Sequence, residues 1–260
     1  MVRLEDTQKA ALLFEQVKAS MVDSCMDKTM GEIWADNENM PQSAAACVGE
    51  FAYLAGKADK KLLEQLAKQR PGLRLFVPPD ESWSAVIEEV YGGRAERIVR
   101  HSFLKEEHVW DAGYLENLVK NLPEEFEIKL IDKDCYQYAT GEEWAKDWTA
   151  QFPTWEEYEK KGLGVVILKE GVPVSGASSY AANARGIEIQ IDTLPAYRRK
   201  GLALACGAAL ILECEKRGLY PSWDAHNTES EALAEKLGYH RDRDYIAYFI
   251  SEKSKGRMEE

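Results

Sequence analysis

The chain has 260 residues and a formal net charge of −12, with acidic and basic side chains spread over both halves. Neither half has the basic face that a nucleic-acid backbone requires, so nucleic acid is not an expected partner. The longest uncharged apolar run, 202–212, is too short to cross a bilayer, and the start of the chain lacks the apolar core of a signal peptide. The five cysteines form no Cys-x-x-Cys pair. We therefore expect a cytoplasmic protein with no membrane partner and no metal or disulfide framework.

The first half alternates between helical and extended patterns. Apolar spacing predicts an amphipathic helix over 7–19, with Ala11, Phe14 and Val17 on one side. Strands are predicted over 51–56, 73–77 and 96–104, and helices over 62–69 and 83–91. This alternation is typical of an α/β layer. Gly92-Gly93-Arg94 is interpreted as a turn between helix and strand. The sequence offers no candidate catalytic or binding residue in this half.

A linker is expected near residues 121–123, which divides the chain into a smaller lobe (1–122) and a second domain (123–260). The second domain begins with a predicted strand over 126–131. Trp144, Trp148 and Phe152 then recur at helical spacing and are followed by Trp155. Residues 164–174 are typical of two strands around a Lys-Glu-Gly turn.

The next segment predicts an anion site. Residues 187–193 alternate Ile with polar side chains as a strand does, and a turn and a helix to Arg217 follow. The first N–H groups of a helix have no internal partner, and the helix dipole favours negative charge there. Gly201 lets the backbone approach a ligand, and Arg198, Arg199 and Lys200 add positive charge. The turn should therefore hold something phosphorylated.

The residues around Gly201 exclude two common phosphate motifs. A P-loop has Lys and Ser or Thr after its second glycine, whereas Leu202 follows Gly201. A dinucleotide fold has three glycines where this turn has one. The remaining pattern, Arg198-x-x-Gly201-x-Ala203, resembles the signature with which GNAT N-acetyltransferases hold the pyrophosphate of acetyl-coenzyme A.

Downstream residues extend this resemblance. Residues 220–227 are typical of a short strand that ends at Asn227, and the helix after it closes in Lys-Leu-Gly-Tyr at 236–239. This is similar to the second GNAT motif, and Gly238 fits a left-handed helix cap. Gly-Ala-Ser-Ser at 176–179 and Pro-Ser-Trp-Asp at 221–224 most resemble the zwittermicin-A-resistance-like branch. The resemblance covers 123–260, and by analogy 1–122 would be a degenerate GNAT-like lobe.

The resemblance implies an α/β (α+β) chain whose C-terminal domain has the GNAT fold, a mixed, mostly antiparallel twisted sheet flanked by helices. It also implies acetyl-coenzyme A as cosubstrate, without a metal. The residues expected to contact the coenzyme belong to the strand end, the turn, the helix start and the second motif: Ile191, Thr193, Arg198, Arg199, Lys200, Gly201, Leu202, Ala203, Asn227 and Ser230.

Acetyl transfer to an amine needs a base, because a free alkyl ammonium has a pKa of about 10. Glu188 is the candidate base, since it stands about where histone-type GNAT enzymes keep a glutamate, and His226 is the alternative. The tyrosine that many GNAT enzymes use as general acid is Ala234 here. Tyr239, Ser230 and water all remain open for that role. An alternative function is a GNAT-fold protein that holds an acyl-coenzyme A, or nothing, without turnover.

The aromatic segment suggests the acceptor. GNAT domains build their acceptor site here, and the faces of Trp144, Trp148 and Trp155 beside acidic neighbours would suit a cation. The same aromatics also fit the core stripe of a helix. The expected acceptor is a small, cationic primary amine, and the expected assembly is a monomer or a homodimer.

Overall fold

The computed structural model describes residues 1–107 and 109–252. It divides into two compact units, one formed by the chain up to Arg100 together with the chain from Tyr245 on, the other by His101–Asp244. The expected boundary near 121–123 lies inside the second unit, because the helix α5 (Ala112–Lys120) packs on α8 (Leu202–Arg217) of that unit. The predicted fold class is confirmed: both units are mixed α/β layers with mostly antiparallel strands.

In the first unit, β1 to β4 pair antiparallel in chain order, and β4 pairs in parallel with β5 after the crossover helix α3. Helices α3 and α4 bury Leu62, Leu66 and Trp83 against the sheet, which forms the core of this unit. Its elements are β1 (Val2–Arg3), η1 (Thr7–Ala10), α1 (Ala11–Phe14), α2 (Ser20–Met26), β2 (Glu32–Ala35), β3 (Ser43–Val48), β4 (Phe51–Gly56), α3 (Lys60–Gln69), β5 (Leu75–Val77), α4 (Glu81–Tyr91) and η2 (Gly92–Arg94). The strand β6 (Ala95–Phe103) begins in this unit, and its residues from His101 on belong to the second unit.

The helix predicted over residues 7–19 is wrong in its length. The chain forms η1 and α1, leaves the helix after Phe14, and begins α2 only at Ser20. The Val17 N–H donates to the Phe14 carbonyl at 2.8 Å, so the chain closes a turn where a helix would bond four residues back. Apolar spacing alone does not distinguish one helix from two short ones on the same side of a core.

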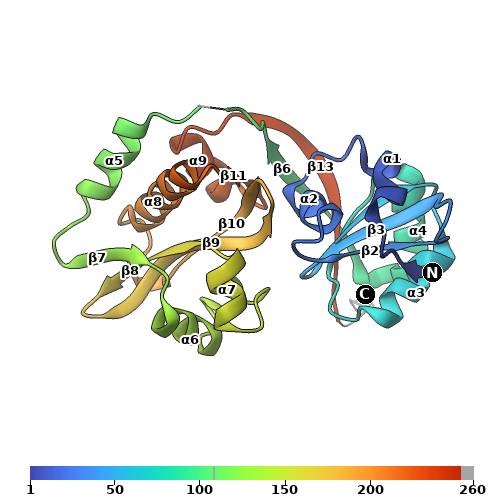
Figure 1. Cartoon of the computed structure of the whole chain (residues 1–260), viewed down its shortest axis with the longest axis horizontal. Coiled ribbons are helices and arrows are strands. Elements are labelled where there is room, and N and C mark those ends of the chain that lie inside the picture. The colour runs from blue at the N-terminus through green and yellow to red at the C-terminus, as the bar shows by residue number, and fades with distance from the viewer. Residues whose placement is uncertain (108, 253–260) are drawn as a thin grey trace, which may run out of the picture. The chain divides into compact units, whose positions relative to one another are not determined.

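In the second unit, β7 to β10 pair antiparallel in chain order, and β10 pairs in parallel with β11 after the crossover helix α8. Figure 1 shows α8 on one face of this sheet and α6 and α7 on the other. Its further elements are β7 (Phe126–Leu130), α6 (Lys133–Gly141), η3 (Lys146–Trp148), α7 (Trp155–Lys161), β8 (Gly164–Lys169), β9 (Val172–Asn183), β10 (Gly186–Thr193), η4 (Pro195–Tyr197), β11 (Tyr220–Ser222), β12 (Asp224–Ala225) and α9 (Thr228–Lys236). The last strand of the chain, β13 (Arg241–Ile250), begins in this unit, and its residues from Tyr245 on belong to the first unit.

The two halves of the sequence repeat one order of elements: a strand, short helices, three antiparallel strands, a crossover helix, a parallel strand, a helix and a last strand. The last strands are exchanged. The strand β13, which ends the second half of the sequence, pairs with β5 of the first unit, and β6 pairs with β12 of the second unit. Neither half of the sequence therefore completes its own sheet.

Among the helices of the described residues, none has the length and apolar character that crossing a membrane would require.

Candidate active site

The parallel strands β10 and β11 separate partway along β10. They pair only from Gly186 to Glu188, opposite Tyr220 to Ser222. Beyond that point β10 continues to Thr193 beside β9, whereas β12 pairs with β6. One edge of residues 189–193, which we call the open edge of β10, has no strand beside it within the described ranges of the chain. Its backbone N–H and C=O groups are suited to pair with an extended ligand.

A basic turn follows the open edge and leads into α8. Gly201 has a φ of +81°, and a Cβ there would meet no atom within 4 Å. The side chains of Arg198, Arg199 and Lys200 are exposed. The Arg198 Nε donates to the Thr193 carbonyl at 3.2 Å, which holds the turn against the strand end. This arrangement fits an anion at the first turn of α8, where N–H groups have no partner inside the helix.

Asn227 and Ser230 lie at the start of α9, in the turn after β12. The Asn227 Oδ1 accepts the Ser230 backbone N–H at 2.8 Å as the helix cap, and its Nδ2 lies 2.9 Å from the His226 Nε2. The Ser230 Oγ accepts the indole N–H of Trp223 at 3.2 Å. Asn227, which was expected from the sequence to contact the coenzyme, therefore uses its side-chain amide to cap α9 in this structure.

In the first unit, two side chains make hydrogen bonds at the elements that correspond in chain order to α8 and α9. The Asp59 carboxylate accepts the Leu62 N–H at 3.0 Å and so occupies the N-terminus of α3. The fully buried Trp83 donates its indole N–H to the Gly56 carbonyl at the end of β4, at 2.9 Å. Trp83 is the third residue after a helix cap, the position that Ser230 holds in the second unit. A carboxylate and an indole thus stand in the first unit where the second unit has basic residues and a serine.

Glu188 lies on β10 where the strand pairing with β9 is irregular. Glu188 is opposite Ala181, but Ile189 is opposite Ser179, so β9 carries an extra residue at this point. Such bulges often lie beside active sites, where they re-aim side chains. Glu188 is 7% exposed. Because side chains alternate along a strand, Glu188 shares a face with Gln190, while Ile189 and Ile191 pack on the α8 side.

His226 and Tyr239 occupy different environments. His226 is exposed in the turn before α9. Tyr239 is 3% exposed, and its O–H donates to the Pro221 carbonyl at 2.6 Å. Burial, and then its neighbours Cys214, Tyr220 and Glu188, raise the pKa of Tyr239 well above its ordinary value. Tyr239 therefore holds its proton firmly. Gly238, with a φ of +101°, has the left-handed conformation that the sequence predicts.

The aromatic segment is not the helix that its spacing suggests, because only the three-residue turn η3 forms between α6 and α7. Trp148 is fully buried, and a Cβ on Gly176 would lie 2.7 Å from its ring. The Trp148 side chain therefore packs in the core against β9. Trp144 and Trp155 are partly exposed. Trp144 meets Trp148 edge to face at a centroid distance of 4.9 Å, and Trp155 packs on Tyr158 of the same unit at 6.0 Å.

The structure adds Asp192, which the sequence analysis did not select. Its Oδ2 accepts the Trp148 indole N–H at 3.2 Å and the Gln190 amide at 3.0 Å. Burial is the main cause that raises the pKa of Asp192, and the Asp147 carboxylate raises it further, against the two hydrogen bonds and Arg198. Because side chains alternate along β10, Asp192 lies on the same face as Glu188. The alternating pattern of residues 187–193 could have indicated this from the sequence.

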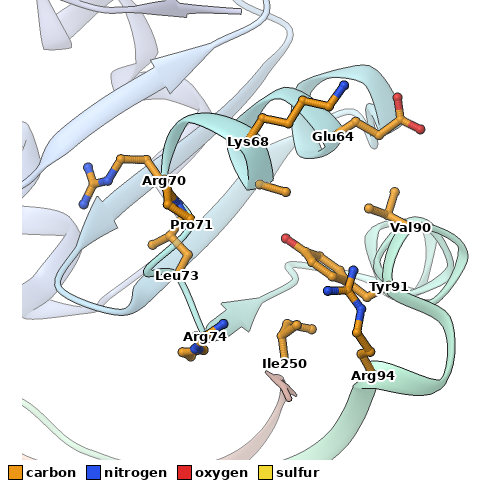
Figure 2. Close-up of a pocket in the computed structure, with 11 residues that line it drawn as sticks. Glu64, Lys68, Arg70, Pro71, Leu73, Arg74, Val90, Tyr91, Arg94 and Ile250 are labelled. Atoms are coloured by element: carbon orange, nitrogen blue, oxygen red, sulfur yellow. The ribbon is translucent and has the colours of Figure 1, made fainter. Parts of the chain in front are cut away.

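A separate hollow of about 480 Å³ lies in the first unit, beside Tyr91 and Arg94. Figure 2 shows that its cationic side chains diverge: Arg70 and Lys68 extend in different directions, and Arg94 lies near Tyr91. Arg70 pairs with Glu32 at 2.5 Å and Arg74 with Glu252 at 2.6 Å. This hollow does not present convergent groups for a reaction.

Comparison with known proteins shows the family of the chain. The family model "GNAT acetyltransferase" matches residues 11–248. The uncharacterized N-acetyltransferase YdfB of Bacillus subtilis (strain 168) is 26% identical over 242 residues, which cover 88% of this chain and 90% of YdfB. A GCN5-related N-acetyltransferase-like protein from Streptococcus suis 89/1591 is 44% identical, with a TM-score of 0.89 over 95% of this chain and 99% of its own.

A GCN5-related N-acetyltransferase from Kribbella flavida shares the fold at 15% identity, with a TM-score of 0.55 over 91% of this chain and 96% of its own. Membership of the zwittermicin-A-resistance-like branch stays a prediction. The family match extends over both units, and so includes the lobe in which the sequence offers no catalytic residue. The chain therefore belongs to the GNAT acetyltransferase family.

Proposed function

We propose that this protein transfers an acetyl group from acetyl-coenzyme A to the primary amine of a small, cationic molecule in the cytoplasm. The observation that carries the proposal is the open edge of β10, which leads directly into the glycine turn at the start of α8. The pyrophosphate would lie on the N–H groups of residues 199–203, beside the exposed basic side chains. The pantetheine would extend along residues 189–193, with Asn227 and Ser230 on the opposite side.

The residues of β10 supply the chemistry on the protein side. When bound, acetyl-coenzyme A presents a thioester whose carbonyl carbon accepts an amine and whose sulfur leaves as a thiolate. Glu188 would take the proton that the ammonium group must lose, so that a neutral amine forms the new C–N bond as the C–S bond breaks. Tyr239 donates to a backbone carbonyl and has a raised pKa. These two properties disfavour Tyr239 as the general acid, so Ser230 and water are the candidates for supplying the proton to the thiolate.

A second candidate function is acyl-coenzyme A binding without turnover. It is favoured by Ala234, which is fully buried at the position where many GNAT enzymes carry a tyrosine. Release of free thiol from acetyl-coenzyme A, measured against a panel of amines and without amine, distinguishes the two. Amine-dependent release supports transfer, whereas binding of coenzyme A with no release for any amine supports the second function.

Gly201→Asp is expected to weaken coenzyme A binding by about 10- to 100-fold relative to Gly201→Asn, equal to about 1.4–2.7 kcal/mol, because its carboxylate would repel the pyrophosphate. The two variants form a matched pair. Asp and Asn have nearly the same shape, and both tolerate the positive φ of this residue better than other side chains do. Their difference therefore reports the carboxylate and not backbone strain. Titration calorimetry gives the affinities, and equal affinities would place the pyrophosphate elsewhere.

Coenzyme A is expected to bind at one site per chain, because Asp59 and Trp83 would close the matching place in the first unit. Ser230→Trp copies that closure into the second unit and should abolish binding at concentrations that saturate the parent protein. Ser230→Ala is the control, since it removes the hydrogen bond from Trp223 without adding bulk. Two calorimetric sites per chain, or full affinity in a folded Ser230→Trp variant, would contradict this assignment.

A further inference from the structure

The carboxylate of Asp192 is held by one oxygen. Trp148 and Gln190 both donate to Oδ2, at 3.2 and 3.0 Å. In the described part of the chain, no residue donates a hydrogen bond to Oδ1. Asp192 is partly exposed at the end of β10, so Oδ1 is the atom through which this fixed carboxylate can meet a ligand.

The surroundings of Asp192 suit a cation. Asp147 is close enough for its carboxylate to raise the pKa of Asp192, in addition to the larger effect of burial. The positive charge of Arg198 acts in the opposite direction and lowers the pKa of Asp192, while the Arg198 Nε donates to the Thr193 carbonyl at the strand end. The partly exposed ring of Trp144 stands edge to face against Trp148, which holds Asp192. A positive charge at Oδ1 would offset both carboxylates and lie near aromatic rings.

The cation at Asp192 is not the group that reacts. An ammonium group bound by a carboxylate keeps its charge, whereas the attacking amine must be neutral. Asp192 lies four residues beyond Glu188 on the same face of the strand, and a rise of about 3.3 Å per residue separates their Cα atoms by about 13 Å. The two carboxylates therefore mark two positions, one for proton removal and one for anchoring.

We propose that Asp192 binds a second, non-reacting ammonium group of the acceptor, so that the substrates are linear di- or polyamines with several methylene groups between their nitrogens. This inference rests on the proposed acetyl transfer and on Glu188 as the base. The sequence predicts a cationic acceptor, and this inference specifies that it carries two amino groups, one that reacts near Glu188 and one that binds at Asp192.

The experiment compares α,ω-diaminoalkanes of increasing length with monoaminoalkanes of matched length, by thiol release from acetyl-coenzyme A. The parent enzyme should prefer the longer diamines by about 10- to 100-fold in kcat/KM, the range of a charge-assisted hydrogen bond. Asp192→Asn should remove this preference by raising the KM for diamines. An amide oxygen can still accept from Trp148 and Gln190, so this variant keeps the local hydrogen bonds. Within each protein, the ratio of kcat/KM for diamines to that for monoamines measures the preference, so a general loss of activity in the variant does not affect the reading.

Activity on amines with no preference for diamines in the parent enzyme would overturn the inference and leave the proposed function standing. This comparison needs no variant, so a misfolded Asp192→Asn protein does not prevent the test. A folded variant, with an unchanged Tm, that keeps the diamine preference would also overturn it. Absence of thiol release for every amine would instead reject the proposed function, and the inference with it.

Discussion

Replacement of Glu188 by Gln is expected to lower kcat by about 10²–10⁴-fold, the loss associated with removal of a general base. Glutamine keeps the size of the buried side chain, which is 7% exposed, but it cannot accept a proton. Raising the pH should restore part of the rate in the variant, because a larger fraction of the amine is then already neutral. Steady-state kinetics at several pH values measure both effects.

The control for Glu188→Gln is the affinity for coenzyme A, which should hardly change because the variant leaves the turn at Gly201 intact. Calorimetry separates this result from a general loss of structure. If kcat at neutral pH is undiminished, Glu188 is not the base. The next candidate is then His226, which is exposed in the turn before α9 beside Asn227.

Replacement of Trp148 by Ala is expected to lower the free energy of unfolding by about 3–5 kcal/mol, the usual cost of removing a large aromatic side chain from a core. The ring is fully buried on Gly176, and its N–H is one of two donors to the Asp192 carboxylate. Denaturant titration of the parent and the variant gives the difference.

Trp144→Ala is the matched control for Trp148→Ala, because Trp144 belongs to the same segment but is partly exposed and should cost less stability. The sequence predicts that the Trp148 ring contacts the amine. That prediction would be supported if Trp148→Ala left the free energy of unfolding unchanged and raised the KM for the amine. A large loss of stability with an unchanged KM in the folded protein assigns Trp148 to the core.

Several elements that position the candidate site could be predicted from sequence. The alternating Ile residues of 187–193 mark a half-buried strand, and the observed β10 has nearly the same bounds. The glycine at 201 marks the start of α8, where φ is +81°. These features depend on local backbone preference and on periodicity, which a short stretch of sequence contains in full.

Two other strands could not be predicted, because their own residues lack the alternating pattern that is typical of a strand. The strand β3 is buried along its whole length and reads Ser-Ala-Ala-Ala-Cys-Val, without alternation. The strand β13 begins with four exposed charged residues, Arg241 to Asp244, and was not predicted. Both strands form because neighbouring strands satisfy their backbone groups, and those neighbours lie elsewhere in the sequence.

The sequence by itself determined the GNAT resemblance, the strand and turn that lead into α8, and Glu188 as the candidate base. Only the tertiary structure decided that the last strands are exchanged between the two halves, that Trp83 and Asp59 make hydrogen bonds at the corresponding elements of the first unit, and that Trp148 lies in the core, where it holds Asp192. The physical reason is the range of the interactions. Caps, turns and amphipathic periods act between residues a few positions apart, whereas strand exchange and the Trp148–Asp192 bond join distant residues whose contact depends on packing of the whole unit.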